Sequence, residues 1–398
     1  MGYRTKANYL HSHAILIPEI DNKGAQSLYR GLMLCCAGAN HPYRDTYLVT
    51  GTMPTKAKER RCMKPAKNFT MDDIARLANV SKPTVSRVLN GSELVTEKTR
   101  QRVLAVARAN GYAINRNAKR LRSKRTNTIA VILDFRSHGH LRIADPFIFE
   151  LLAGVSEALS LRKQDLLLSP PDLGDAPEAY QDMLRSKGAD GFIFLGLGAR
   201  KPLLETLAKQ KAPLIVWGAV TKDSPYCAVG SDNFYGGVLA GRRLIEQKRK
   251  RLLFIGNSKH HEIELRWEGF KSLADSQPKS TSLTKIEIND FAFSTSFTAI
   301  RQYLDTNRAP DGIFAYNDTA AMAIISALRE KGLHAPSDYS IIGYNDIPSS
   351  GHFFPAITTV RQDTLAAGSL LVEKLMSILD GNEVESVTLP TELIVRQT

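Results

Sequence analysis

The chain has 398 residues, of which 43% are hydrophobic, and its formal net charge is +13. This length predicts two or three globular domains with sizeable cores. No apolar run approaches the roughly 18 residues needed to span a bilayer, so we expect a soluble protein and exclude a membrane-spanning one.

The positive charge is concentrated in one part of the sequence. Residues 63–126 carry a net charge of +11 and residues 1–62 carry +5, whereas residues 127–398 carry −3. A strongly basic segment beside a nearly neutral body is typical of a protein that binds a polyanion. The charge alone leaves open the alternative of a basic surface that meets only solvent.

The cysteines are distributed unevenly as well. Three of the four, Cys35, Cys36 and Cys62, precede residue 63, and only Cys227 lies beyond it. A disulfide framework is therefore not expected, and the reducing environment of the cytoplasm is the expected location.

The first 62 residues differ in pattern from the rest of the chain. They show no sustained helical or strand period, and organised sequence begins at Met63. We expect residues 1–62 to be disordered or absent from the natively translated protein, with Met63 or Met53 as the natural start. The apolar run 31–39 resembles the core of a signal peptide, but it lies late in the chain for export.

The basic segment begins with a predicted amphipathic helix. Thr70 is a good N-cap, and Asp73 follows three residues later, near the positive end of the helix. Ile74, Leu77 and Ala78 then form an apolar stripe at helical spacing.

A second short helix is predicted after a turn at residues 79–80. Ser81 can cap it, Pro83 falls in its first turn, and Gly91 ends it. Its inward stripe consists of Val85, Val88 and Leu89, and its N-terminal and outward side carries Lys82, Thr84, Ser86 and Arg87.

A third helix over residues 97–110 completes the segment. Two short helices joined by a tight turn and braced by a third form a helix-turn-helix, whose second helix enters the major groove of DNA. A small helical bundle with a polar face is the alternative.

The sequence 69–133 resembles the N-terminal part of the lactose/galactose-repressor (LacI/GalR) family, most specifically in T-V-S-R-V-L-N at residues 84–90. The resemblance extends over residues 63–398. It implies an all-α helix-turn-helix domain at 63–113, a hinge at 114–126 and a two-lobed effector-binding and dimerisation domain at 127–398.

The resemblance also implies which residues contact DNA. Lys82, Pro83 and Arg87 match base-reading positions; Thr84, Ser86 and Asn90 match positions at or near phosphates; and Ser81 begins the same helix. The family usually has a longer polar side chain where Pro83 stands. Proline can make only apolar contact with a base edge, for example with a thymine methyl group.

The hinge is basic and poor in apolar residues, so it should be disordered by itself. The resemblance implies that it folds on operator DNA and that Leu121 wedges into the minor groove, where an apolar wedge kinks the duplex. Asn115, Ala118 and Arg122 match other hinge positions. An ordinary basic linker is the alternative.

From residue 127 onward, strand-like apolar runs alternate with helical patterns. The runs lie at 129–133, 165–169, 191–196, 213–217, 251–256, 312–316 and 339–344. This repeat predicts an α/β body with parallel sheets covered by helices. The resemblance implies two lobes, as in periplasmic sugar-binding proteins, with three crossings of the chain and a ligand cleft at the carboxyl ends of the strands.

Candidate effector-binding residues lie where these strands end or match family pocket positions: Asp145, Phe147, Trp217, Arg266, Asn317, Asn345 and Gln362, the last in the final crossing. The indole of Trp217 can stack on a sugar ring, with a core tryptophan as the alternative. The guanidinium of Arg266 suits paired hydroxyls, with a surface arginine as the alternative.

Two departures from the family concern the ligand. Aspartate often stands where this chain has Asn345, and in some members where it has Gly218. An aromatic ring, neutral amides and one arginine suit an uncharged sugar better than a phosphate or a purine.

No nucleophile–base pair, dinucleotide loop or metal-ligand spacing is found, so we expect neither an enzyme nor a cofactor or metal site. We predict a ligand-responsive transcription regulator, a repressor of carbohydrate-utilisation genes. We expect it to bind a pseudo-palindromic operator as a homodimer, because no leucine-heptad tail follows the last strand pattern. A sugar-binding protein or sugar-acting enzyme with an incidental basic arm is the main alternative, and an architectural DNA binder is another.

Overall fold

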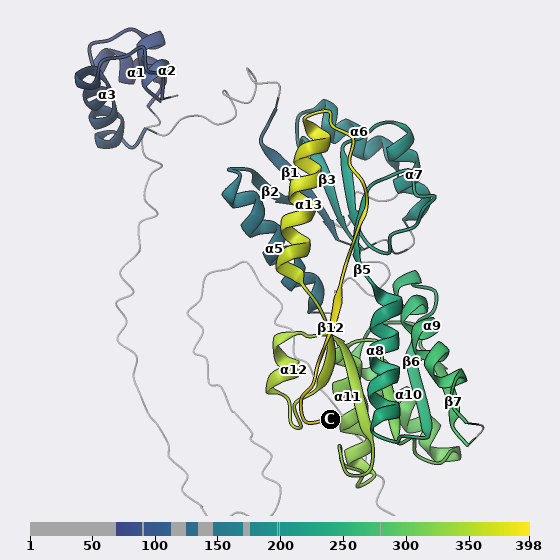
Figure 1. Cartoon of the computed structure of the whole chain (residues 1–398). Coiled ribbons are helices and arrows are strands. Elements are labelled where there is room, and N and C mark those ends of the chain that lie inside the picture. The colour runs from purple at the N-terminus through teal and green to yellow at the C-terminus, as the bar shows by residue number, and fades with distance from the viewer. Residues whose placement is uncertain are drawn as a thin grey trace, which may run out of the picture. The chain divides into compact units, whose positions relative to one another are not determined.

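The computed structural model describes residues 69–89, 91–112, 125–133, 146–169, 176–196, 198, 200–278 and 280–398. They form a three-helix head and two α/β lobes (Figure 1). The all-α head and the α/β class with largely parallel sheets are confirmed.

The head comprises α1 (Met71–Leu77), α2 (Lys82–Leu89) and α3 (Glu97–Ala109). Thr70 caps α1 as predicted: its hydroxyl accepts a hydrogen bond from the Asp73 amide at 3.2 Å, and the Asp73 carboxylate accepts one from the Thr70 amide at 3.0 Å. This reciprocal box satisfies two amides that the first turn of a helix leaves unpaired.

The apolar stripes of the three helices meet in one small core. Ile74, Val85, Val88, Val103 and Ala107 are all buried in it. The tight turn between α1 and α2 depends on Asn79, whose φ of 49° is a left-handed conformation that asparagine tolerates well. The predicted helix-turn-helix is therefore formed, except that Leu77, which was expected in the apolar stripe of α1, is 54% exposed.

The first lobe is a six-stranded parallel sheet in the order β11-β5-β4-β3-β1-β2. Its strands are β1 (Thr128–Leu133), β2 (Asp165–Leu168), β3 (Gly191–Leu195), β4 (Leu214–Trp217), β5 (Ala228–Ser231) and β11 (Val387–Leu389). Helices α5 (Phe147–Leu161) and α13 (Thr364–Leu379) cover one face, and α6 (Pro177–Arg185) and α7 (Lys201–Lys209) cover the other (Figure 1).

The buried strands of this lobe are apolar on both faces. In β1, Ile129 and Val131 pack with α5 and α13, whereas Ala130 and Ile132 belong to the opposite core. Side chains of a strand alternate between the two faces of its sheet, so a strand covered by helices on both sides must be continuously hydrophobic. This is why these strands were recognisable as apolar runs.

The second lobe has a sheet in the order β12-β10-β9-β8-β6-β7, parallel except that β12 runs antiparallel to β10. Its strands are β6 (Arg251–Gly256), β7 (Ser282–Glu287), β8 (Gly312–Ala315), β9 (Ser340–Asn345), β10 (Thr358–Gln362) and β12 (Thr391–Ile394). Its helices are α8 (Asn233–Glu246), α9 (His261–Asp275), α10 (Phe293–Thr306), α11 (Asp318–Glu330) and α12 (Pro348–His352).

The chain crosses between the lobes three times, as expected. The crossings join β5 to α8, β10 to α13 and β11 to β12. Gln362 is the last residue of β10 and therefore belongs to the second crossing, which corrects its placement in the final one. The final crossing lies between Leu389 and Thr391.

Helices α8 and α9 of the second lobe pack with their backbones in close contact. A Cβ atom at Gly269 would lie 1.9 Å from the carbonyl oxygen of Phe234, and one at Gly237 would lie 2.1 Å from that of Arg266. Glycine is therefore required at both positions, and this contact sets the position of Arg266 on α9.

Among the residues that the structure describes, no helix is both long enough and apolar enough to traverse a lipid bilayer.

Candidate functional site

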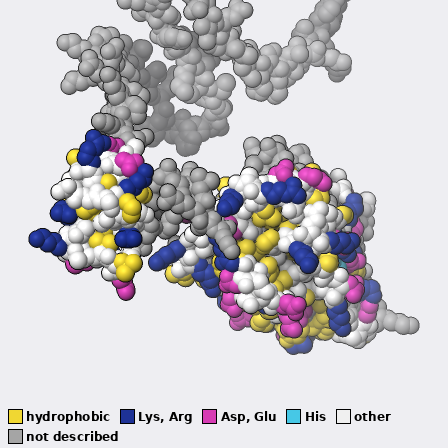
Figure 2. Space-filling model, turned by 90° about the horizontal axis from the view of Figure 1, so that it is seen from above, with side chains coloured by type: hydrophobic (Ala, Val, Ile, Leu, Met, Phe, Trp, Pro, Cys, Tyr) yellow, Lys and Arg dark blue, Asp and Glu magenta, His cyan; other side chains and the backbone are white. Residues whose placement is uncertain are grey.

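Helix α2 presents its polar residues outward while Val85 and Val88 face the core of the head. Ser81, Lys82, Pro83 and Arg87 are exposed, and Thr84 and Ser86 are partly exposed. The Ser81 hydroxyl lies 3.4 Å from the Thr84 amide and 2.9 Å from the Thr84 hydroxyl. Several Lys and Arg side chains, dark blue, lie on the face of the head that is visible in Figure 2.

The candidate DNA-binding residues divide into two groups. Those on α2 form one accessible polar surface, in which the Lys82 ammonium pairs with the Asp72 carboxylate at 2.8 Å. Both side chains are more than half exposed, so this ion pair contributes little to stability. The remaining candidates lie outside the described residues: Asn90, Asn115, Ala118, Leu121 and Arg122.

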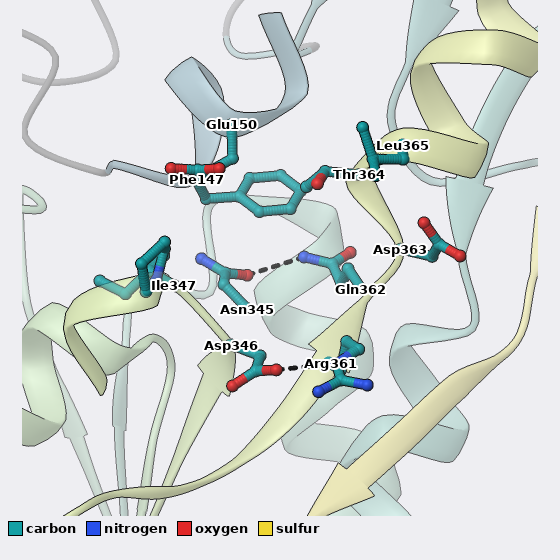
Figure 3. Close-up of a pocket in the computed structure, with 11 residues that line it drawn as sticks. Phe147, Glu150, Asn345, Asp346, Ile347, Arg361, Gln362, Asp363, Thr364 and Leu365 are labelled. Atoms are coloured by element: carbon teal, nitrogen blue, oxygen red, sulfur yellow. Dashed lines mark hydrogen bonds and ion pairs between the residues drawn. The ribbon is translucent and has the colours of Figure 1, made fainter. Parts of the chain in front are cut away.

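A pocket of about 280 Å³ lies where the lobes meet. Phe147 and Glu150 line it from α5 of the first lobe, and Asn345 and Gln362 line it from the ends of β9 and β10 of the second. In Figure 3, Phe147 and Leu365 lie on one side of the Asn345–Gln362 pair, and Asp346 and Arg361 lie on the other. The volume is near the lower end of the ~300–1,000 Å³ usual for small-molecule sites.

Two predicted amides are joined in this pocket. The Gln362 side-chain amide donates to the Asn345 side-chain oxygen at 2.7 Å, and both residues are about 95% buried. Asn345 has a φ of 105°, a strained conformation for a residue other than glycine. The bond between them holds the two buried amides at fixed positions at the strand ends.

Arg266 is buried, with 7% of its surface exposed, so the surface-arginine alternative is wrong. Its Nε donates to the Asn233 side-chain oxygen at 2.8 Å and its Nη1 donates to the Tyr316 carbonyl at 2.6 Å. Its guanidinium carbon lies 3.6 Å from the centre of the Tyr344 ring. Two hydrogen bonds and an aromatic face therefore fix the guanidinium at the ends of β8 and β9.

Burial raises the pKa of Tyr344 to about 12, and the neighbouring Arg266 charge opposes that shift. The phenol is therefore neutral at physiological pH, and it meets Arg266 as an aromatic surface rather than as a counter-ion.

The other predicted effector residues occupy nearby but different places. Asn317 is fully buried and caps α11 by accepting from the Ala320 amide at 2.8 Å. Trp217 is 7% exposed and packs in the core of the first lobe, with its ring centre 5.9 Å from that of Phe147. Asp145 lies outside the described residues.

Two further carboxylates lie near the predicted asparagines: Asp346, which was not predicted, lines the pocket, whereas Asp318 does not. The first is Asp346, whose carboxylate lies 2.7 Å from Arg361 and 2.5 Å from Arg396. The second is Asp318, which is fully buried and accepts from the Ile347 amide at 2.9 Å and the Thr359 hydroxyl at 2.5 Å. Both directly follow a predicted site asparagine, and an Asn-Asp pair after a strand was the pattern that could have indicated them.

One hydrogen bond joins the lobes at another point of the cleft. The Glu262 side chain on α9 accepts from the Ala219 amide at 3.1 Å, just after β4. No local pattern predicts this contact, because a glutamate on an amphipathic helix usually faces solvent.

The chain is similar to known regulatory proteins over most of its length. Residues 70–115 match the family described as bacterial regulatory proteins of the lacI family, and residues 242–398 match a periplasmic binding protein-like domain. The transcriptional regulator CelR of Thermobifida fusca is 30% identical over 334 residues, which are 83% of this chain and 98% of that protein. The chain belongs to the LacI family of transcriptional regulators.

Other LacI-family proteins are similar over comparable lengths. Catabolite control protein A of Priestia megaterium is 28% identical over 83% of this chain and 99% of its own length. A structure of CelR in complex with cellobiose has a TM-score of 0.58 at 27% identity, and covers 83% of this chain and 99% of that one.

Two further solved structures are similar to this chain. A ribose-bound LacI-family regulator from Enterococcus faecium has a TM-score of 0.58 at 27% identity, and covers 68% of this chain and 97% of that one. A lac repressor dimer bound to operator has a TM-score of 0.72 at 24% identity, with 83% and 99% coverage, which supports the same fold for this LacI-family chain.

Proposed function

We propose that this LacI-family regulator is a ligand-responsive repressor of carbohydrate-utilisation genes, with DNA bound by its head and a sugar bound between its lobes. The observation that carries the proposal is the combination of an exposed polar face on α2 with a buried arginine and a paired amide at the strand ends of a two-lobed body. The first feature suits base edges and the second suits hydroxyls.

The division of the chain that we propose follows from this assignment. Residues 63–113 form the DNA-binding domain, 114–126 the hinge, and 127–398 the effector-binding and dimerisation domain, while 1–62 stand apart as an extension. Support comes from the separate core of the head and from the family match at 70–115.

DNA binding uses two kinds of contact in this proposal. Lys82, Pro83 and Arg87 meet base edges, and Ser81, Thr84, Ser86 and Asn90 fix the helix against phosphates. Hinge residues Asn115, Ala118, Leu121 and Arg122 add contacts in the minor groove. Two heads of a homodimer reach two half-sites of a pseudo-palindrome in adjacent major grooves.

The proposed ligand is a neutral sugar. The Arg266 guanidinium and the Gln362 amide are polar groups that suit hydroxyls, and Phe147 adds an apolar ring to the pocket that Gln362 lines. The Glu150 carboxylate also lines this pocket, together with Asp346, which is paired with two arginines. Phe147, Trp217, Asn317 and the undescribed Asp145 complete the proposed set. CelR in complex with cellobiose and the ribose-bound regulator are relatives whose ligands are uncharged sugars.

The regulation that we propose is a shift between two states of the body. Sugar alters the closure of the lobes, and the altered closure changes the separation of the two hinges and heads on DNA. Ligand can shift this balance only by the difference between its affinities for the two states. Acting on DNA, the protein is proposed to reside in the cytoplasm and to catalyse no reaction.

The test is a screen of mono- and disaccharides by thermal shift, followed by release of DNA from the full chain. A palindrome obtained by selection from random duplex serves as the DNA. Arg266→Gln should abolish the sugar response and leave DNA binding intact, whereas Arg301→Gln, at an exposed arginine on α10, should change neither. A full sugar response of the Arg266 variant would remove that residue from the site.

A sugar-binding protein or sugar-acting enzyme with an incidental basic arm predicts a different result. In that case, deletion of residues 63–126 would leave every activity in place. The regulator predicts that sequence-specific DNA binding disappears while sugar binding survives.

A further inference from the structure

Ile347 belongs to the second lobe by its position in the chain and to the first lobe by its packing. It follows the end of β9 and is the N-cap residue of α12. Only 2% of its surface is exposed, and its side chain is part of the apolar core cluster that contains Phe147, Trp217 and Val229. The other buried members of that cluster lie in strands and helices of the first lobe. The second lobe therefore places one of its own side chains in the core of the first.

The backbone that leads to Ile347 has an uncommon conformation. Asn345 and Asp346 precede it with φ values of 105° and 57°, two successive residues in the left-handed region. Backbone of this kind persists only where the surrounding structure determines it. Here Gln362 donates to the Asn345 side chain, and the Asp346 carboxylate pairs with two arginines of the same lobe. The second lobe thus builds the turn and presents Ile347 at a fixed point.

The main chain of Ile347 is anchored to the second lobe as well. Its amide donates to the Asp318 carboxylate at 2.9 Å, and the same carboxylate accepts from the Thr359 hydroxyl at 2.5 Å. Asp318 is fully buried and is the first residue of α11, where the positive end of the helix dipole favours a negative charge. Because its backbone is held by one lobe and its side chain packs in the other, Ile347 links the two directly.

A side chain of α11 reinforces this link. Met322 lies one turn after Asp318 and packs against the apolar cores of both lobes. Such contacts favour association of the lobes, because separation would expose the apolar surfaces to water. Met322 is only partly buried, whereas Ile347 is almost wholly buried, so Ile347 is expected to contribute more.

The candidate ligand pocket adjoins Ile347. Phe147 and Leu365 of the first lobe line this pocket together with Ile347, which lies in a row with Asn345 and Gln362 in the view of Figure 3. The walls of the pocket come from both lobes, so its shape depends on the seating of Ile347 in the first lobe.

We propose that Ile347 is the apolar lock of the cleft: seated in the core of the first lobe, it holds the two lobes against each other. Its use in regulation rests on the proposed function, because a sugar that bridges the lobes in the adjoining pocket adds to the closure that Ile347 maintains. Ile347 is thus a positioning residue, which acts on the ligand through the relative placement of the two lobes.

The experiment is hydrogen–deuterium exchange of the full chain without ligand, read at single amides by mass spectrometry. The Ala219 amide reports separation of the lobes, because its acceptor is Glu262 of the second lobe. The Tyr316 amide donates to the Ile255 carbonyl at 3.0 Å inside the second lobe, so it reports the stability of that lobe alone. Ile347→Ala removes three buried carbon atoms and should raise the ratio of the Ala219 rate to the Tyr316 rate at least tenfold.

Two further variants separate a lock between the lobes from a general contribution to stability. Ile347→Val keeps most of the apolar side chain and should raise the ratio less than threefold. Ile300→Ala removes the same atoms from α10, in the core of the second lobe, and should speed exchange at both amides without raising the ratio.

Two results would overturn the proposal: an unchanged ratio in Ile347→Ala, or an equal rise of the ratio in Ile300→Ala. The measurement uses neither sugar nor DNA. A failure of the sugar screen would therefore count against the proposed function and leave the lock in place, and an unchanged ratio would count against the lock alone.

Discussion

Replacing Gly269 with alanine should force helices α8 and α9 apart and displace Arg266. The added methyl carbon would lie 1.9 Å from the Phe234 carbonyl oxygen and 3.1 Å from the Val238 nitrogen. These neighbours are backbone atoms of a helix, so no side-chain rotation can relieve the contact. The helices must separate by roughly 1.5 Å to restore an ordinary carbon–oxygen contact.

The expected loss of stability follows from the packing of α8 against α9. Overpacking a core costs about 1–3 kcal/mol, and a clash of one helix backbone with another belongs at the upper end. At about 2–4 °C per kcal/mol for a body of this size, the thermal midpoint should fall by roughly 6–12 °C. Arg266 lies one turn before Gly269, and a shift of this size exceeds the tolerance of its 2.8 Å bond to Asn233.

The assay is scanning calorimetry of the full chain, followed by sugar titration of the folded variant at low temperature. Gly351→Ala is the matched control, because a Cβ there has its nearest neighbour at 3.7 Å, in the Arg396 side chain. The control should retain its midpoint and its sugar response. An unchanged midpoint together with an unchanged sugar response in Gly269→Ala would refute the reasoning.

Three other predictions concern the head, the buried phenol and the cleft. Thr70→Ala should remove the capping box of α1 and cost about 1 kcal/mol, seen as about fivefold faster amide exchange in α1; Thr96→Ala, where no side-chain cap exists, should have a smaller effect on α3. The free energy of unfolding should fall between pH 10 and pH 12, because the pKa of Tyr344 is about 12 in the folded protein and its ordinary value is 10. The stability that this phenol contributes is complete below pH 10. In denaturant titrations, Tyr344→Phe should therefore reduce the loss of stability by about 2–3 kcal/mol. Glu262→Ala should remove the hydrogen bond that joins the lobes and change sugar affinity by up to about tenfold in calorimetry, and an unchanged affinity would show that this bond does not affect closure.

The parts of the fold that were predictable are those in which local chemistry and burial agree. Thr70 and Asp73 indicate the start of α1, and the apolar stripes that include Ile74 and Val85 face one core. The strands of both lobes that are covered on two faces appear as continuous apolar runs, such as β1 and β3.

The elements that escaped prediction are short, polar or at an edge. β10 contains Thr358, Thr359 and Gln362, all buried, because Thr398, Asp318 and Asn345 satisfy their polar groups from distant parts of the chain. A polar strand of this kind cannot be recognised until its partners are known. β7 is half-exposed and lies at the edge of its sheet, and β5 has only four residues.

The candidate site shows the same limit. Asn345 and Gln362 could each be predicted from the sequence as effector-binding residues. The hydrogen bond between them could not, because it depends on the pairing of β9 with β10. The burial of Arg266 depends on the contact of α8 with α9. Each is a tertiary property that no local pattern contains.

The proposed function depends most on a head that selects a DNA sequence under the control of a sugar-binding body. The most direct measurement is fluorescence anisotropy of the full chain on a selected palindrome and on random duplex, at one stated salt concentration, with and without the sugar identified by screening. The proposed regulator should bind the palindrome at least 1,000-fold more tightly than random duplex, and sugar should change its affinity for the palindrome at least tenfold. Equal affinity for both duplexes, unchanged by any sugar that binds, would contradict it.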